Sequence, residues 1–314
     1  MSKLKDVFFK AGGFGLLKQY WRAGALWVAI TQFCLLGRSM KALEILRLTV
    51  SLKTQQRLAR KYSRILKRYH LNESQEHISS KKLWIFWWQG MENAPTLVHR
   101  CYESVNEYLY DWDIKLITKD NYQQFVNFPE FILNKYEKGI ISTAHFSDLL
   151  RLELLIRYGG LWLDATVLCT SSIIPRSIIN SDLFVFQAQK PGADGHATLL
   201  SNWLIYSKTN NILLEMTLHM LYDYWKKNDS LIDYFIFHHF FTIACNHYPE
   251  EAKKIPPFCN SIPHILQLHL FDQYDETYWD DLKRMVCFHK LTYKLDSKKC
   301  MAKGTYYDMI INIK

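Results

Sequence analysis

Three charged residues carry the chemistry that this sequence offers: Asp148, Arg151 and Asp164. The first two lie three positions apart within residues 142–158, where apolar residues recur at helical intervals, so both should project from one face of a helix. A glycine pair predicts the end of that helix, and the apolar run behind it predicts a buried strand. Asp164 ends this strand, at the edge where open α/β sheets bind their ligands. A carboxylate there can hold a divalent cation or a ribose hydroxyl, so the pattern predicts a nucleotide-sugar site.

The order of these features also resembles a known group of enzymes. The pattern is S-D-x-x-R, an apolar helix, G-G, an apolar strand and an acid, with Asp164 sixteen positions after Asp148. It resembles the DxD glycosyltransferases, the group of the α-mannosyltransferases and the glucosylating toxins, and within it the capsular polysaccharide synthesis protein family. The resemblance implies that Asp148 and Arg151 bind the donor sugar as catalytic residues and that Asp164 binds metal and nucleotide. It also implies a GT-A type fold and transfer with retention of configuration.

One position departs from the family pattern, because the second acid of the D-x-D triplet is Thr166 here. The capsular branch resembles this chain in its D-A-T form, so the departure is compatible with an active enzyme. A threonine hydroxyl is a much poorer ligand for Mn²⁺ or Mg²⁺ than a carboxylate. We therefore expect Asp164 and Thr166 to share a divalent cation whose coordination is completed by phosphate oxygens and water, or by a distant residue such as His289.

Each of these residues also has a plainer interpretation. Asp164 can be an exposed acid that caps the following turn. Asp148 and Arg151 can form a surface ion pair worth well under about 1 kcal/mol. The ordered combination, rather than any single residue, favours the site.

Length and composition fit a globular α/β enzyme with an appendage. The chain has 314 residues, of which 49% are apolar and 22% charged, enough for one large domain and a smaller segment. Its seven cysteines are scattered, odd in number and without a C-x-x-C pair. This spacing indicates reduced thiols in the cytosol and argues against a disulfide framework or a zinc site.

Positive charge is concentrated at the N-terminus. Residues 1–70 hold fifteen Lys or Arg and two acidic residues, whereas the rest of the chain has 24 basic and 28 acidic residues. The catalytic body therefore lacks the basic, aromatic-interleaved motif that a nucleic acid partner needs. An anionic membrane surface is the better partner for the basic segment.

Two apolar features of this segment favour a membrane surface. Residues 23–37 are uncharged and mostly apolar, but as a helix they span roughly 22 Å, short of the hydrocarbon thickness of about 30 Å. Farther on, basic residues surround an apolar stripe made of Leu58, Tyr62, Ile65 and Tyr69. We expect residues 1–80 to hold the protein peripherally on the cytoplasmic side of the cell membrane. The alternative is a helical hairpin that packs against the catalytic domain.

The catalytic domain is predicted over residues 81–314, after a polar linker over 72–82. An apolar first strand over 83–88 is followed by helical spacing over 95–108 and by a second strand over 113–117. This alternation predicts an α/β fold with a mainly parallel central sheet and helices on both faces. Together with the resemblance, it predicts a GT-A type nucleotide-binding fold.

Trp88 is the expected partner of the nucleotide base. In related enzymes the first strand ends with an aromatic residue and a glycine, and the matching residues here are Trp88-Gln89-Gly90. The face of a Trp ring suits a uracil or guanine ring. A slip of one residue in strand register would move this role to Trp87, and both rings can instead belong to the core.

Later segments supply further candidates. Asn202 lies in a polar segment that related enzymes place near the donor and acceptor sugars, or else it caps a turn. Asp233 is a candidate general base on the acceptor side, with His238 nearby, and its alternative is to cap the following helix. Lys290 and Lys294 are candidates for neutralising phosphate charge, or else they belong to a solvated surface.

Together these features predict a metal-dependent glycosyltransferase that moves a hexose from a UDP- or GDP-sugar to a growing, lipid-linked capsular or cell-surface polysaccharide. Electrostatic stabilisation of the leaving diphosphate fits the lack of a Ser-His-Asp or reactive-Cys signature. Two other interpretations stay open. One is a catalytically degenerate protein that binds nucleotide sugar, and the other is a membrane scaffold of a polysaccharide-assembly complex.

Overall fold

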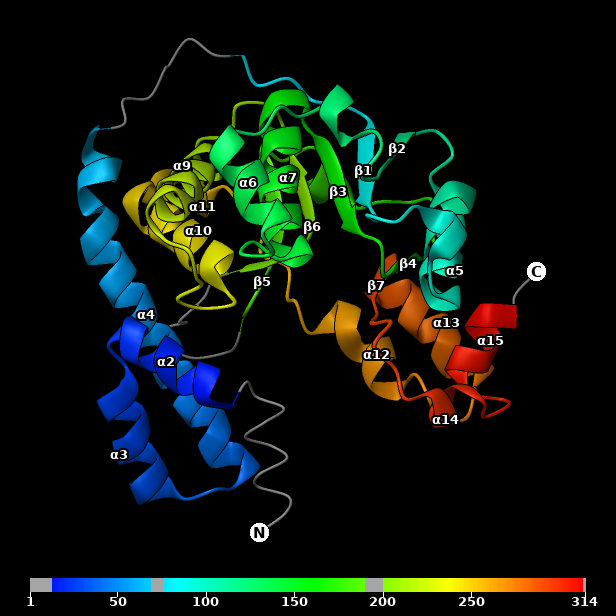
Figure 1. The fold of residues 1–314 in the computed structure, drawn as a ribbon. Coiled ribbons are helices and arrows are strands. Elements are labelled where there is room, and N and C mark those ends of the chain that lie inside the picture. The colour runs from blue at the N-terminus through cyan, green and yellow to red at the C-terminus, as the bar shows by residue number, and fades with distance from the viewer. Residues whose placement is uncertain (1–12, 69–75, 190–199, 313–314) are drawn as a thin grey trace.

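The structure is a computed structural model that describes residues 13–68, 76–189 and 200–312 (Figure 1). Its centre is a five-stranded sheet in the order β2-β1-β3-β6-β5. The strands are β1 (Lys82–Phe86), β2 (Asp113–Ile117), β3 (Gly160–Asp164), β5 (Leu183–Gln187) and β6 (Leu200–Ser207). β1 pairs in parallel with β2 and β3, and β6 runs antiparallel to its neighbours β3 and β5. The predicted mainly parallel sheet is confirmed.

Helices cover both faces of the sheet, because successive strand residues point to opposite sides and both sides are apolar. Trp84 and Trp162 belong to the core on one face, and Leu83 and Leu161 to the core on the other. The helices on the first face are α6 (Glu130–Glu137), α7 (Thr143–Tyr158), α9 (Ile212–Lys227) and α10 (Ile236–His247). Those on the second face are α5 (Thr96–Tyr108) and α8 (Arg176–Ile179). The predicted α/β architecture is therefore confirmed.

Two glycines fix the turn from α7 into β3. Ser142 begins α7, where its hydroxyl accepts a hydrogen bond from the backbone N–H of His145 at 3.5 Å. Gly159 ends the helix with a φ of 64°, and Gly160 opens β3 with a φ of 98°. A Cβ atom on Gly160 would lie 2.2 Å from the carbonyl oxygen of Lys82 in β1. Glycine is thus required for the close approach of these two strands.

A second sheet of two strands places a segment near the C-terminus beside the end of β3. β4 (Val167–Cys169) follows β3 and pairs antiparallel with β7 (Phe288–Lys290). The C-terminal helices form a further core that includes Leu97 of α5 and Leu168 of β4. These helices are α12 (Ile265–His269), α13 (Glu276–Met285), α14 (Ser297–Cys300) and α15 (Tyr306–Asn312), and the remaining short ones are α11 (Pro249–Lys253), η1 (Met91–Asn93), η2 (Tyr122–Gln124) and η3 (Ile262–His264).

The first strand is shorter than the predicted range of 83–88. β1 ends at Phe86, and Trp87 and Trp88 belong to the loop that follows. The backbone N–H of Trp87 still donates to the carbonyl oxygen of Ile117 at 3.0 Å, which holds this loop against the end of β2. Both tryptophans therefore lie just beyond the carboxyl edge of the sheet.

Among the described residues before the sheet, the helices are α2 (Gly13–Ala23), α3 (Leu26–Leu36) and α4 (Met40–Arg68). They pack on one another around Ala25, Ala29 and Val50. The long α4 runs along α10, so its second half lies against the catalytic body (Figure 1). In the described part of the chain, no helix combines the length and the apolar character needed to cross a bilayer.

The apolar stripe on α4 does not face a membrane, contrary to the prediction that it lies in a membrane surface. Leu58 and Tyr62 are buried in the main core, where the Tyr62 ring lies 4.7 Å from that of Phe240 in α10, and Ile65 packs against the same core. Tyr69 lies outside the described residues. For this stripe, packing against the catalytic domain is the correct alternative. An apolar stripe with this spacing can be covered by protein as well as by lipid, so the spacing alone did not distinguish the two.

We expect Gly160→Ala to destabilise the protein by more than about 3 kcal/mol, and Gly139→Ala to serve as a mild control. Both glycines have a positive φ, so alanine carries about 1–2 kcal/mol of backbone strain at either position. At Gly139 a new Cβ meets nothing within 4 Å, whereas at Gly160 it meets the backbone of β1. Thermal unfolding followed by far-UV circular dichroism compares the two. Equal melting temperatures would contradict the close approach of β1 and β3.

Candidate active site

A cavity of about 900 Å³ opens at the carboxyl ends of β1 and β3. Asp164 lies there as the last residue of β3, paired with Phe86 at the end of β1. The predicted site residues that line the cavity are Trp88, Asp148, Arg151, Asp164, Thr166, Asn202, His238, Lys290 and Lys294. The described lining includes neither Asp233 nor His289. Residues from α7, β3, β6, β7 and the chain after β7 thus converge on one pocket.

Asp148 and Arg151 form the buried centre of this pocket. Arg151 Nη2 lies 3.3 Å from Asp148 Oδ1, and the side-chain amide of Asn202 donates to the same oxygen at 2.8 Å. Arg151 also donates to the carbonyl oxygen of Asn202 and, at 3.2 Å, to the hydroxyl of Ser147. Its guanidinium lies over the Trp162 ring, 4.8 Å from the centroid. Because Asn202 lies within β6 and binds both residues of the pair, its alternative assignment as a turn cap is wrong.

Burial distinguishes this pair from a surface ion pair. The side chains of Asp148 and Arg151 are 12% and 6% exposed, so the surface-pair interpretation is wrong. Burial raises the pKa of Asp148, but the positive charge of Arg151 and the neighbouring His145 outweigh burial and hold the pKa below its usual value. The carboxylate is therefore ionised at neutral pH and can accept hydrogen bonds from ligand hydroxyls.

Asp164 lies between two cationic side chains. Its Oδ1 accepts a hydrogen bond from Trp162 Nε1 at 3.1 Å and lies 3.4 Å from Arg151 Nη1. Its Oδ2 lies 3.4 Å from Lys290 Nζ. Arg151 therefore joins both carboxylates of the pocket. The alternative that Asp164 is an exposed acid capping a turn does not account for these contacts with Arg151 and Lys290.

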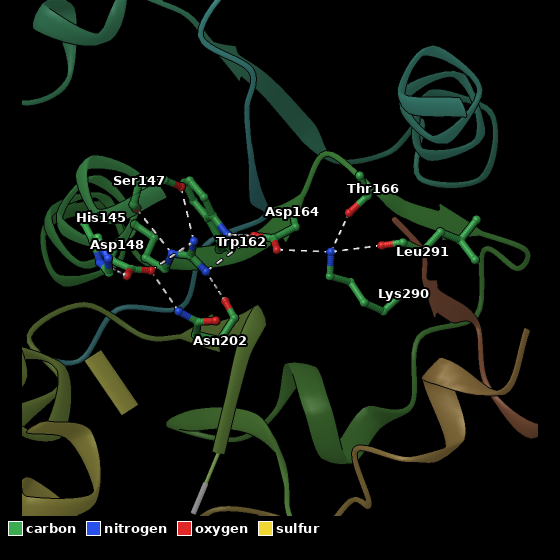
Figure 2. Close-up of polar contacts among 10 residues, drawn as sticks. His145, Ser147, Asp148, Trp162, Asp164, Thr166, Asn202, Lys290 and Leu291 are labelled. Atoms are coloured by element: carbon green, nitrogen blue, oxygen red, sulfur yellow. Dashed lines mark hydrogen bonds and ion pairs between the residues drawn. The ribbon is translucent and has the colours of Figure 1, made fainter. Parts of the chain in front are cut away.

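Lys290 reaches the triplet from the far end of the chain (Figure 2). Its Nζ donates to Thr166 Oγ1 at 2.5 Å and to the carbonyl oxygen of Leu291 at 3.2 Å, besides its contact with Asp164. The pairing of β4 with β7 places Val167 opposite Lys290 and so makes this contact possible. Lys290 was expected to bind phosphate, and its contact with the triplet was not predicted. Lys294 lies on the exposed rim of the same cavity.

His289 does not reach the triplet. Its side chain is fully buried, with Nε2 3.2 Å from Thr170 Oγ1 and the ring 5.8 Å from that of Trp279. Burial lowers the pKa of His289 to about 4. Neighbouring strand residues point to opposite sides, so Lys290 faces the cavity and His289 faces the C-terminal core. Its assignment as a metal ligand is therefore wrong.

Asp233 is not among the described residues that line the cavity. Its Oδ1 accepts a hydrogen bond from the backbone N–H of Phe235 at 2.7 Å, and its Oδ2 lies 3.5 Å from His239 Nε2. Asp233 thus stabilises the turn before α10, a role similar to the helix cap that was the alternative prediction. These contacts do not fit the assignment of Asp233 as a general base.

Other residues of the same segment line the cavity. They are His238, Tyr234 and Phe235, and the two aromatic side chains are exposed. Burial lowers the pKa of His238 to about 4, so its ring is neutral at physiological pH. Tyr234 and Phe235 were not predicted, although a pair of aromatic residues beside two predicted site residues was the signal that could have indicated them.

Both candidate tryptophans line the cavity. Trp88 is half-buried, and its ring lies 5.1 Å from that of Tyr136 and 5.5 Å from that of Phe146. The Trp87 ring lies 5.3 Å from that of Tyr293, which also lines the cavity. Base stacking by Trp88 stays a prediction, with Trp87 as the alternative.

The donor set around the triplet does not fit a divalent cation. Within the described residues, no group of three or more His, Cys, Asp or Glu side chains is arranged to hold a metal ion. Mg²⁺ and Mn²⁺ favour several oxygen ligands with free lone pairs. Here the Asp164 oxygens face N–H donors or cations, and the Thr166 hydroxyl accepts a hydrogen bond from Lys290. The expected Mn²⁺ or Mg²⁺ is a prediction that the chemistry of these residues does not support.

Comparison with curated proteins finds glycosyltransferases. The O-glycosyltransferase braB of Annulohypoxylon truncatum is 29% identical over 165 residues, and the O-glycosyltransferase PaGT of Phomopsis amygdali is 24% identical over 152 residues. These matches cover 47% and 43% of this chain, and 38% and 36% of the two relatives. Among solved structures, the PaToxG glycosyltransferase is 16% identical with a TM-score of 0.36, covering 84% of this chain and 97% of that one.

A family model gives the longest of these matches. The model described as capsular polysaccharide synthesis protein covers residues 40–310, from the start of α4 to α15. It therefore includes the whole sheet and every residue that lines the cavity. The resemblance inferred from Asp148, Arg151 and Asp164 is confirmed, and the chain belongs to the capsular polysaccharide synthesis protein family.

Proposed function

We propose that this chain transfers a hexose from a UDP- or GDP-hexose to a hydroxyl group of a growing capsular or cell-surface polysaccharide. The main support is the buried network of Asp148, Arg151 and Asn202, which shares one cavity with Asp164 at the carboxyl ends of the parallel strands. This edge is where α/β sheets bind nucleotides, and a fixed carboxylate suits sugar hydroxyls. The two fungal relatives are O-glycosyltransferases by name, which favours an oxygen acceptor.

In the proposed donor complex, each part of the pocket binds one part of the nucleotide sugar. Asp148 accepts hydrogen bonds from the sugar hydroxyls, and Arg151 holds this carboxylate in a fixed position. Trp88 or Trp87 stacks on the base. The diphosphate lies toward Lys290 and Lys294. Holding the sugar ring in one position leaves its anomeric carbon open to the acceptor.

Retention of configuration is part of this proposal. The bond between the anomeric carbon and a diphosphate oxygen breaks, and its electron pair leaves with the diphosphate. The acceptor oxygen forms the new bond on the same face, and its proton passes to the leaving diphosphate. Preorganised charges stabilise both the diphosphate and the oxocarbenium-like sugar, so no protein nucleophile is needed.

For the acceptor, we propose a lipid-linked oligosaccharide that enters past Tyr234 and Phe235. These exposed aromatic side chains offer apolar faces to a sugar ring, and the half-buried, neutral His238 lies beside them. The segment just before them joins the N-terminal helices, since Ile232 packs against the small core around Ala25. An acceptor anchored near those helices would therefore reach the cavity on this side.

We expect Asp148→Asn to reduce sugar transfer at least about a hundredfold, because the substitution removes the negative charge and puts an N–H donor in place of one acceptor oxygen in a desolvated site. Glu153→Gln is the matched control. Glu153 lies on the same helix, pairs with Arg157 and accepts from Tyr222, but it does not line the cavity. The measurement is release of UDP or GDP from a panel of nucleotide hexoses, together with the thermal shift caused by UDP or GDP alone.

The two measurements also test the other interpretations. Nucleotide binding that survives in Asp148→Asn while release of nucleotide is lost supports the proposed role in binding the sugar. A wild-type protein that binds donors without turnover would instead be a catalytically degenerate member, and one that binds none would be a scaffold. Equal losses in Asp148→Asn and Glu153→Gln would show that both changes act through stability.

We also propose peripheral attachment to the cytoplasmic side of the cell membrane through α2, α3 and the first half of α4. Large apolar side chains are exposed there, among them Trp27 at 74% and Leu35 at 77%. Exposed basic residues accompany them, namely Arg22, Arg38, Lys41 and Arg47. Apolar contact and attraction to anionic lipid together favour binding in the plane of a membrane surface. This surface is distinct from the buried stripe of Leu58 and Tyr62.

We expect the double substitution Trp27→Ser and Leu35→Ser to reduce co-sedimentation with vesicles that contain phosphatidylserine. The matched control replaces Ile173 and Leu268, which are equally exposed apolar residues of the catalytic body, with serine. High salt should release the wild type only in part, because it screens the charges but not the apolar contact. If both double variants sediment like the wild type, the attachment surface lies elsewhere.

A further inference from the structure

Lys290 lies in the place between Asp164 and Thr166 where a metal ion was expected. An ammonium group has three N–H donors. Here two of them are used in hydrogen bonds to Thr166 Oγ1 at 2.5 Å and to the carbonyl oxygen of Leu291 at 3.2 Å, and the ammonium group also forms an ion pair with Asp164 Oδ2 at 3.4 Å. The side chains of Lys290 and Asp164 are 18% and 26% exposed and line the cavity. The positive charge is therefore held by protein groups on one side and open to a ligand on the other.

The main chain holds this lysine in place. Lys290 pairs with Val167 across the β4–β7 sheet. The backbone N–H of the next residue, Leu291, donates to the carbonyl oxygen of Thr166 at 2.9 Å. Backbone contacts thus fix the lysine to the D-A-T triplet, unlike a surface lysine on a mobile stem.

A divalent cation and this ammonium group exclude one another. A cation bound to Asp164 would lie beside Lys290 and Arg151, which both contact that carboxylate. Like charges at such distances repel strongly in a partly buried site. The Thr166 hydroxyl adds no negative charge to offset this repulsion. The metal would have to displace Lys290 and break its three contacts.

We propose that the Lys290 ammonium takes the place of the divalent cation, so that this protein binds the diphosphate of its donor without a metal ion. The inference rests on the proposed function. When the bond to the anomeric carbon breaks and its electron pair leaves with the diphosphate, Lys290 stabilises the added negative charge. A lysine is suited to phosphate as a compact point charge.

The first experiment measures binding of UDP and GDP to the full chain by tryptophan fluorescence, in EDTA and with Mn²⁺. We expect equal affinity in both conditions for the wild type. Lys290→Met should weaken binding at least about tenfold, as the loss of one charge-assisted contact predicts, and Lys290→Arg should restore part of it. Lys208→Met is the matched control, since Lys208 is a comparably buried lysine that pairs with Asp182 at 2.7 Å and does not line the cavity.

The second experiment rebuilds a metal site. Thr166→Asp combined with Lys290→Met adds a carboxylate and removes the ammonium group. We expect this double variant to bind Mn²⁺, measured by electron paramagnetic resonance of free Mn²⁺, and the wild type to bind none at Asp164. Thr166→Asp alone should bind Mn²⁺ more weakly, because Lys290 still competes. Melting temperatures of all variants identify any that fail to fold. If Lys290→Met fails to fold, the conservative variant Lys290→Arg still tests the position through its nucleotide affinity in EDTA.

The outcomes separate this inference from the proposed function. Nucleotide binding that needs Mn²⁺, or Mn²⁺ binding by the wild type that Asp164→Asn abolishes, overturns the role of Lys290 and leaves the glycosyltransferase proposal standing. Absence of UDP and GDP binding in every condition overturns both. Binding in EDTA that falls in Lys290→Met, but not in Lys208→Met, supports the inference.

Discussion

The guanidinium group of Arg151 is the interaction on which the rest of the site depends. It pairs with Asp148 on its own helix, with Asp164 at the end of β3 and with the carbonyl oxygen of Asn202 in β6. Without it, two carboxylates would lie in one partly buried pocket with less compensating charge, which is costly. The planar, multiply donating guanidinium suits this task better than an ammonium group on a flexible stem. The helix and the sheet edge are therefore held in one geometry before any ligand binds.

The pairing of β4 with β7 supplies the second half of the pocket. Through it, the chain returns from the C-terminal helices and places Lys290 beside Asp164 and Thr166. The triplet D-A-T thus becomes part of an arrangement with one carboxylate, one hydroxyl and one built-in positive charge. Fold and site chemistry are coupled here, because a one-residue shift of β7 would turn His289 toward the cavity and Lys290 away from it.

The N-terminal helices illustrate how one periodicity can have two uses. In the second half of α4, Leu58 and Tyr62 complete the core of the catalytic body against α10. In α3, Trp27 and Leu35 stay exposed. The physical difference is the presence of a covering partner within the chain. A basic, apolar helical segment can therefore be read from sequence, but whether protein or solvent covers it depends on how it packs.

The sequence by itself determined the local features of this protein. Helical spacing around Asp148 and Arg151, the glycine pair and the apolar run before Asp164 follow from period, turn chemistry and strand propensity, and together they identified the α/β fold and the family. Tertiary structure alone decided which distant groups meet. It selected Lys290 over His289 beside Thr166, and Tyr234 and Phe235 over Asp233 at the cavity. These choices depend on strand register and on the turn before α10, which long-range packing sets, so no local pattern in the chain encodes them.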